Sequence, residues 1–182
     1  MNDSKISVRY SRALFLSALG KNILDKVYSD MLMISEICLV PEFRELLENP
    51  VIRPSKKVEI IHKVIGDNIE SITRSMIDMV VRNGRENFLP AIARAFLHKT
   101  KEHNGITETT LTTAVKVDEK IKTRISDLIA EKFNTKVELK EVIDKDIIGG
   151  FMLRIEDKYI NASIKNKLRI IEKELLAKTL TD

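Results

Sequence analysis

The sequence predicts an all-α six-helix bundle at the N-terminus followed by a small α+β domain at the C-terminus. From residue 4 to about residue 103, apolar residues recur at helical spacing, and the pattern breaks at glycine, proline and asparagine. Residues 106–115 are instead rich in threonine, isoleucine and valine, which favour strands. We therefore place a boundary near residue 105, between a domain of residues 1–105 and a domain of residues 106–182.

The first domain divides into six helical segments. Each ends near a residue that stops helices or begins near one that starts them, such as a proline in the first turn or a glycine after the last turn. We expect helices over residues 5–19 and 22–39, a short third helix opened by Pro41, a fourth capped by Ser55 and ended by Gly66, a fifth over 68–82 and a sixth over 86–103.

The second domain alternates strand and helix patterns. Residues 106–115 predict the first strand, and Asp118 is placed to cap the helix that follows it. Three further strands are expected over 137–143, 147–155 and 158–160. Asn161 is expected to cap a final helix, on which four apolar residues recur along one side: Ile164, Leu168, Ile171 and Leu175.

Composition excludes several classes of protein. The longest uncharged run is the eight residues 13–20, far short of the roughly 20 apolar residues that span a bilayer. The N-terminus lacks the zones of a secretory signal, so we expect a cytoplasmic protein without direct membrane insertion. Basic and acidic residues number 31 and 27 and are interspersed. This pattern argues against nucleic acid, although a pI near 9.1 keeps a nucleic-acid-associated module as an alternative.

No catalytic or cofactor-binding constellation is found. The three histidines, His62, His98 and His103, lack acid, base or metal-ligand spacing, and we expect exposed surface side chains. Gly149-Gly150 lacks the context of a phosphate-binding loop and predicts a bulge or a close backbone approach. We expect no catalytic residue, no cofactor and no metal. The alternative, an α+β enzyme, would need a cluster of reactive groups that the sequence does not show.

The first and fifth helices carry more apolar surface than one core-facing stripe requires. On the first, Val8, Phe15, Leu16 and Leu19 extend round from a stripe of Tyr10, Ala13, Leu14 and Ala18. On the fifth, Ile77 and Val81 lie beside a stripe of Ile69, Ile72, Met76, Met79 and Val80. The surplus fits either a groove for an amphipathic partner helix or a central helix packed on two sides, and periodicity alone favours the second.

Several short motifs, in order along the chain, carry a resemblance to a known family. They lie in residues 7–15 (SVRYSRALF), 47–52 (LENPVI, with Lys56-Lys57 after it), 83–85 (NGR), 147–155 (IIGGFMLRI) and 159–168 (YINASIKNKL). Together they resemble the delta subunit of F-type ATP synthases, known in mitochondria as the oligomycin-sensitivity-conferring protein. Asn161, where the family usually has aspartate, and Ser11, where alanine is commoner, are departures.

The resemblance implies a non-catalytic stator subunit of a proton-translocating ATP synthase, on the cytoplasmic face of the bacterial inner membrane. The helical domain would bind the N-terminal helices of the alpha subunits of the catalytic head. The C-terminal domain would bind the b subunits of the peripheral stalk, so that the head resists the torque of the rotor. The implied alpha-subunit groove comprises Tyr10, Ala13, Leu14, Ile72, Met76, Met79 and Val80, and the motif of the stalk-binding domain comprises Gly149, Gly150, Asn161, Ser163 and Leu168.

Overall fold

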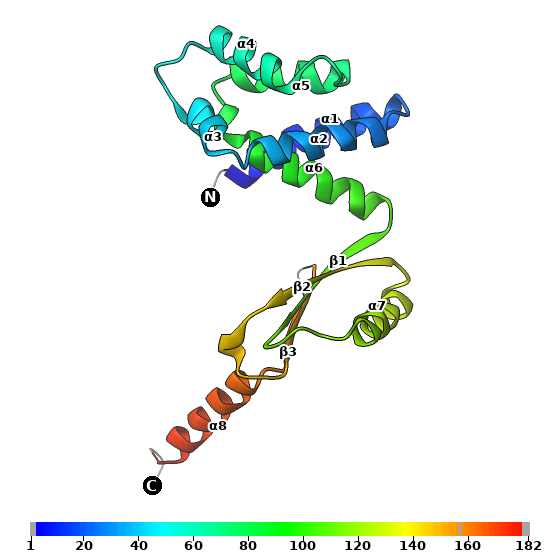
Figure 1. The fold of residues 1–182 in the computed structure, drawn as a ribbon, viewed down its shortest axis with the longest axis vertical. Coiled ribbons are helices and arrows are strands. Elements are labelled where there is room, and N and C mark those ends of the chain that lie inside the picture. The colour runs from blue at the N-terminus through cyan, green and yellow to red at the C-terminus, as the bar shows by residue number, and fades with distance from the viewer. Residues whose placement is uncertain (1–2, 157, 180–182) are drawn as a thin grey trace. The chain divides into compact units, whose positions relative to one another are not determined.

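The computed structural model describes residues 3–156 and 158–179, with side chains described over 5–156 and 158–172. The chain divides into two compact units, Met1–His103 and Asn104–Asp182 (Figure 1). The first is helical, and the second combines a sheet with helices.

The helical unit packs its elements around one apolar core. Its elements are α1 (Asp3–Gly20), α2 (Leu24–Ile37), α3 (Pro41–Glu48), α4 (Pro54–Ile65), α5 (Ser71–Arg82), the 3-10 turn η1 (Glu86–Phe88) and α6 (Leu89–His103). α1 and α2 pack against α6, and α4 packs against α5 (Figure 1). The core is formed by residues of most of these helices, among them Phe15, Val27, Met31, Ile34, Leu47, Ile61, Ile77, Val80, Ile92 and Phe96.

Three predicted helix starts in this unit were wrong. α6 begins at Leu89, three residues later than predicted, because the 3-10 turn η1 occupies residues 86–88. Ser55 does not cap α4, because Pro54 already occupies the first helical position with Arg53 as the N-cap. α5 begins at Ser71, three residues later than predicted. Its start is stabilised from outside the helix, because Asp30 of α2 accepts hydrogen bonds from the Glu70 backbone N–H (2.9 Å) and the Thr73 hydroxyl (2.8 Å).

A buried ion pair joins three elements of the helical unit. The Lys57 ammonium on α4 donates to the Glu86 carboxylate on η1 at 2.5 Å and to the Leu47 carbonyl on α3 at 2.9 Å. Both charged side chains are almost completely shielded from solvent. The pair therefore holds the α3–α4 connection against the start of α6.

The second unit is a four-stranded mixed sheet with helices. Its elements are β1 (Ile106–Thr113), α7 (Glu119–Phe133), β2 (Lys136–Ile143), the 3-10 turn η2 (Lys145–Ile147), β3 (Phe151–Ile155), β4 (Lys158–Asn161) and α8 (Ile164–Thr179). The strand order is β2-β1-β3-β4, with β1 parallel to β2 and the other neighbours antiparallel. α7 is the crossover between the parallel strands, and its Ile129 packs on Leu111, Leu153 and Ile155.

The third strand and the last helix differ from prediction. β3 starts at Phe151 instead of residue 147, because η2 and the positive φ angles of Ile148 (67°) and Gly150 (76°) interrupt an extended path. Asn161 does not cap α8, since it is still the last residue of β4. The cap is Ser163, whose hydroxyl accepts from the Asn166 N–H at 3.2 Å. Asp118 does cap α7, as predicted, by accepting from the Lys120 N–H.

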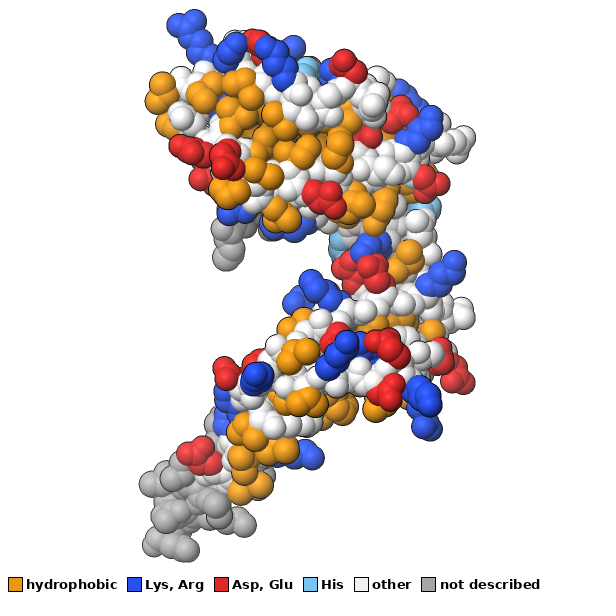
Figure 2. Space-filling model, viewed as in Figure 1, with side chains coloured by type: hydrophobic (Ala, Val, Ile, Leu, Met, Phe, Trp, Pro, Cys, Tyr) orange, Lys and Arg blue, Asp and Glu red, His pale blue; other side chains and the backbone are white. Residues whose placement is uncertain are grey.

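The apolar side of α8 is open to solvent. Ile164, Leu168 and Ile171 are all exposed on the described part of this helix. Figure 2 shows hydrophobic side chains on the surface where α8 leaves the sheet. The side chain of Leu175, the fourth residue of the predicted stripe, lies outside the described residues.

Candidate partner-binding site

α1 and α5 together form an apolar groove of about 340 Å³. Leu14 and Met76 are buried at its floor, whereas Met79 is 53% exposed. Tyr10, Ala13 and Ile72 complete the apolar lining, and the polar part comprises Ser17, Lys21, Ser71 and Ser75. Two helices that are distant in sequence thus share one concave apolar surface.

Six of the seven residues predicted for the groove line it, but Val80 does not. Val80 is 0% exposed and belongs to the core of the helical unit. It follows Met79 directly on α5, so its side chain turns about 100° away from that of Met79. The apolar stripe predicted on α5 is therefore wider than the groove, and Val80 at its edge packs into the core of the helical unit.

Tyr10 is held in place by the NGR motif. Its hydroxyl accepts hydrogen bonds from the side chains of Asn83 (3.2 Å) and Arg85 (3.1 Å). The Arg85 guanidinium also lies 5.8 Å from the centre of the Tyr10 ring. The NGR motif contributed to the family resemblance, but the sequence did not reveal that it holds Tyr10. The contact joins residues more than 70 positions apart.

The serines and the lysine of the groove were also missed by sequence reasoning, because helical periodicity marks apolar residues and gives no signal for polar ones beside them. Lys21 is the charged residue among those that line the groove. The described lining therefore offers apolar contact, hydroxyl groups and one ammonium group, and it includes no carboxylate and no histidine. This arrangement suits binding of an amphipathic helix.

The other candidate groups do not assemble a reactive site. His62 contacts the Asp78 carboxylate at 2.7 Å and so links α4 to α5, contrary to the expectation of a free surface histidine. His98 is exposed, and His103 packs edge-on against Phe15. Cys38 is buried, as predicted, and desolvation raises the pKa of its thiol to about 11. Over residues 3–156 and 158–179, no group of three His, Cys, Asp or Glu side chains could hold a metal ion.

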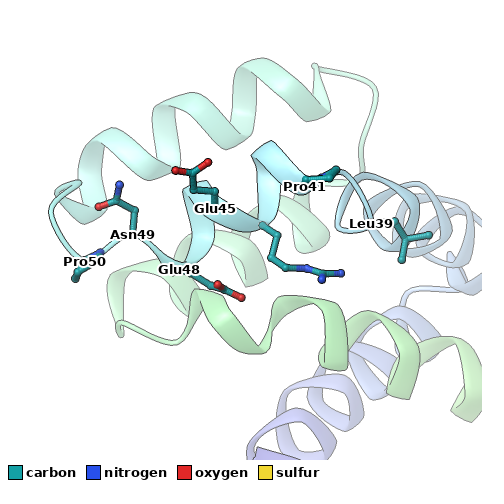
Figure 3. A pocket seen from close by; sticks show the side chains of 7 residues that line it. Leu39, Pro41, Glu45, Glu48, Asn49 and Pro50 are labelled. Carbon is teal, nitrogen blue, oxygen red and sulfur yellow. The ribbon is translucent and has the colours of Figure 1, made fainter.

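A second depression lies between the end of α2 and α3. Its lining includes Glu45 and Glu48, whose carboxylates leave α3 on different sides (Figure 3). Because the two groups do not converge, they do not form a pair for acid–base chemistry.

The predicted C-terminal motif forms the joint between β3, β4 and α8. A Cβ atom at Gly150 would clash with the Ala162 carbonyl, and the Gly149 carbonyl accepts from the Ile164 N–H at 3.0 Å. Asn161 accepts from both the backbone N–H and the hydroxyl of Ser163. Leu168 lies further along α8 and is exposed. The structure thus brings Gly149, Gly150, Asn161 and Ser163 together and places Leu168 on the adjoining open surface.

Within the described part of the chain, no helix combines the length and apolarity that crossing a bilayer requires.

Comparison with known proteins supplies the family. The model of the family "ATP synthase delta (OSCP) subunit" matches residues 6–175. The ATP synthase subunit delta of Christiangramia forsetii is 34% identical over 176 residues, covering 96% of this chain and 95% of the relative. Those of Parabacteroides distasonis and Flavobacterium psychrophilum are 33% and 32% identical, each again over nearly the full length of both chains.

The fold has a counterpart among solved structures. A chain of the Toxoplasma gondii mitochondrial ATP synthase hexamer superposes with a TM-score of 0.76 at 20% identity, covering 93% of this chain and 97% of that one. The function follows from the family match over nearly the whole chain: this is a structural subunit of the ATP synthase stator and not itself a catalyst. The chain belongs to the ATP synthase delta (OSCP) subunit family.

Proposed function

We propose that the chain joins the catalytic head of a bacterial F-type ATP synthase to its peripheral stalk through two separate surfaces. The six helices α1–α6 act as a bundle, residues 1–105, that binds alpha-subunit N-terminal helices in the α1–α5 groove. Residues 106–182 bind the b subunits. The chain works as a peripheral subunit on the cytoplasmic face of the inner membrane, where it opposes the torque of the rotor.

The observation that carries the head-binding role is the half-exposed Met79 above the buried floor of the groove. An amphipathic helix could place its apolar side on Leu14 and Met76, and Met79 could adapt to its shape because methionine is flexible. Tyr10, anchored by Asn83 and Arg85, offers a rigid aromatic contact at the same surface.

The open side of α8 supports the stalk-binding role. When a partner covers exposed apolar residues on one side of a helix, the complex is stabilised by about 25 cal/mol for each Å² of apolar surface buried. Ile164, Leu168 and Ile171 form such a side, next to the joint built from Gly149, Gly150, Asn161 and Ser163.

Met79→Asp tests the head-binding role. The carboxylate is hydrated in the free chain but would be buried without a partner on binding, so affinity for an alpha-subunit N-terminal peptide should fall more than about tenfold, or 1.4 kcal/mol. Isothermal titration with the full chain measures this.

Val64→Asp is the matched control for this test, because Val64 is 50% exposed on α4 and does not line the groove. It should leave the affinity unchanged. Equal affinities for Met79→Asp and the unaltered chain would contradict the assignment of the groove.

A further inference from the structure

The helical unit has a second groove, formed by α1 and α6, with a volume of about 580 Å³. Val8 and Leu16 of α1 are 56% and 55% exposed along it, and Phe15 is buried beneath. The remaining lining residues are Ser11, Arg12, Ala95, His98 and Lys99.

The two grooves use different sides of α1. Tyr10, Ala13, Leu14 and Ser17 line the first, whereas Val8, Ser11, Arg12, Phe15 and Leu16 line the second. No described lining residue is common to both. The surplus apolar surface of α1 is therefore accounted for by two concave surfaces, and a partner in one leaves the residues of the other uncovered.

The α1–α6 groove differs from the first in its charge. Arg12 and Lys99 are cationic, and the described residues that line the groove include no carboxylate. The nearby Glu102 pairs with Lys99 at 2.9 Å, but both side chains are about half exposed, and a surface pair of this kind contributes little free energy. The α1–α5 groove has only Lys21 among its described lining residues.

We propose that the α1–α6 groove docks an amphipathic helix of a partner protein that carries acidic residues beside its apolar side. The apolar residues of that helix cover Val8 and Leu16, and its carboxylates pair with Arg12 and Lys99. Charge complementarity selects this occupant over a neutral or basic helix. The concave shape favours an inserted helix over a flat anionic membrane. This proposal goes beyond head and stalk binding and does not depend on either.

Designed peptides of about 15 residues, long enough to form helix on binding, provide the probe. One peptide has leucines at helical spacing flanked by glutamates, and its matched control has lysines in place of the glutamates. The full chain should bind the glutamate peptide at least about tenfold more tightly than the lysine peptide, with an affinity that falls as salt is added.

Single substitutions in the two grooves show which of them binds the glutamate peptide. Leu16→Asp should weaken binding of the glutamate peptide more than about tenfold, and Val8→Asp provides a second change at the same groove if Leu16→Asp lowers the melting temperature. Arg12→Glu should reduce the preference for the glutamate peptide. Met79→Asp, in the other groove, should have no effect, so the two grooves are tested independently.

Four results would overturn the proposal. One is equal affinity for the two peptides, and another is full binding by Leu16→Asp and Val8→Asp. The third is Leu16-dependent sedimentation with phosphatidylserine vesicles in the absence of glutamate-peptide binding, which would assign the surface to a membrane. A loss of alpha-peptide binding in Leu16→Asp as large as that in Met79→Asp would likewise show that the two grooves are not separate sites.

Discussion

At the scale of single residues, glycine geometry decides how the second unit closes. Gly150 has a φ of 76°, and a Cβ atom there would lie 2.4 Å from the Ala162 carbonyl oxygen. Glycine is thus required here both for the left-handed backbone and for the close approach of the segment between β4 and α8 to the residue before β3. Sequence reasoning predicted either a bulge or a close backbone approach at this glycine pair. The structure shows the close approach, but the approaching residue could not be deduced from spacing.

Gly150→Ala should therefore destabilise the second unit by more than the roughly 1–2 kcal/mol that a left-handed alanine costs by itself. Gly105→Ala is the matched control, because Gly105 has a φ of 64° and open space around its Cβ position. Hydrogen exchange of β3 amides in the full chain measures the difference. Equal protection in the two variants would show that the contact with Ala162 contributes nothing.

The buried thiol of Cys38 gives a second prediction at this scale. Because burial raises its pKa to about 11, only about one molecule in a thousand carries the reactive thiolate at pH 8. Cys38 is the one cysteine of the sequence, so labelling by a thiol reagent should be slow in the folded chain and fast once denaturant unfolds the helical unit. Fast labelling without denaturant would show that Cys38 is accessible.

At the scale of elements, tertiary contacts determine what local sequence cannot. The helices were located from apolar periodicity because each buries one side, and Gly66 and Asp118 cap helices as predicted. The start of α5 was misplaced because its stabilising group, Asp30, is about 40 residues away. The cap of α8 was misplaced because pairing with β3 extends β4 through Asn161.

The Lys57–Glu86 pair gives the prediction at this scale. Lys57→Met would leave the Glu86 carboxylate buried without its cation, which costs about 3–5 kcal/mol. The double variant Lys57→Met/Glu86→Leu removes both charges and should recover much of the loss. Denaturant titrations of the three chains measure these effects, and a double variant no more stable than Lys57→Met would contradict the assigned role of the ion pair.

At the scale of the whole molecule, composition was sufficient to separate a helical region from a mixed one. The structure divides after His103, close to the predicted boundary near residue 105. The groove was partly foreseen, because surplus apolar surface on two helices requires either a partner or further packing. Val80 shows the limit of that reasoning, since periodicity does not reveal which edge of a stripe packs inward. The anchoring of Tyr10 by Asn83 and Arg85 likewise required the folded chain.

The central claim is that one chain binds the head and the stalk at the same time through different surfaces. The measurement is the amount of soluble b-subunit domain retained on an immobilised alpha-subunit N-terminal peptide as the full chain is added. We predict that the amount of retained b domain rises as the chain is added. The Met79→Asp chain should retain none, because it no longer binds the peptide. The Leu168→Asp chain should still bind the peptide but retain no b domain. Failure of the unaltered chain to retain the b domain while bound to the peptide would contradict the account.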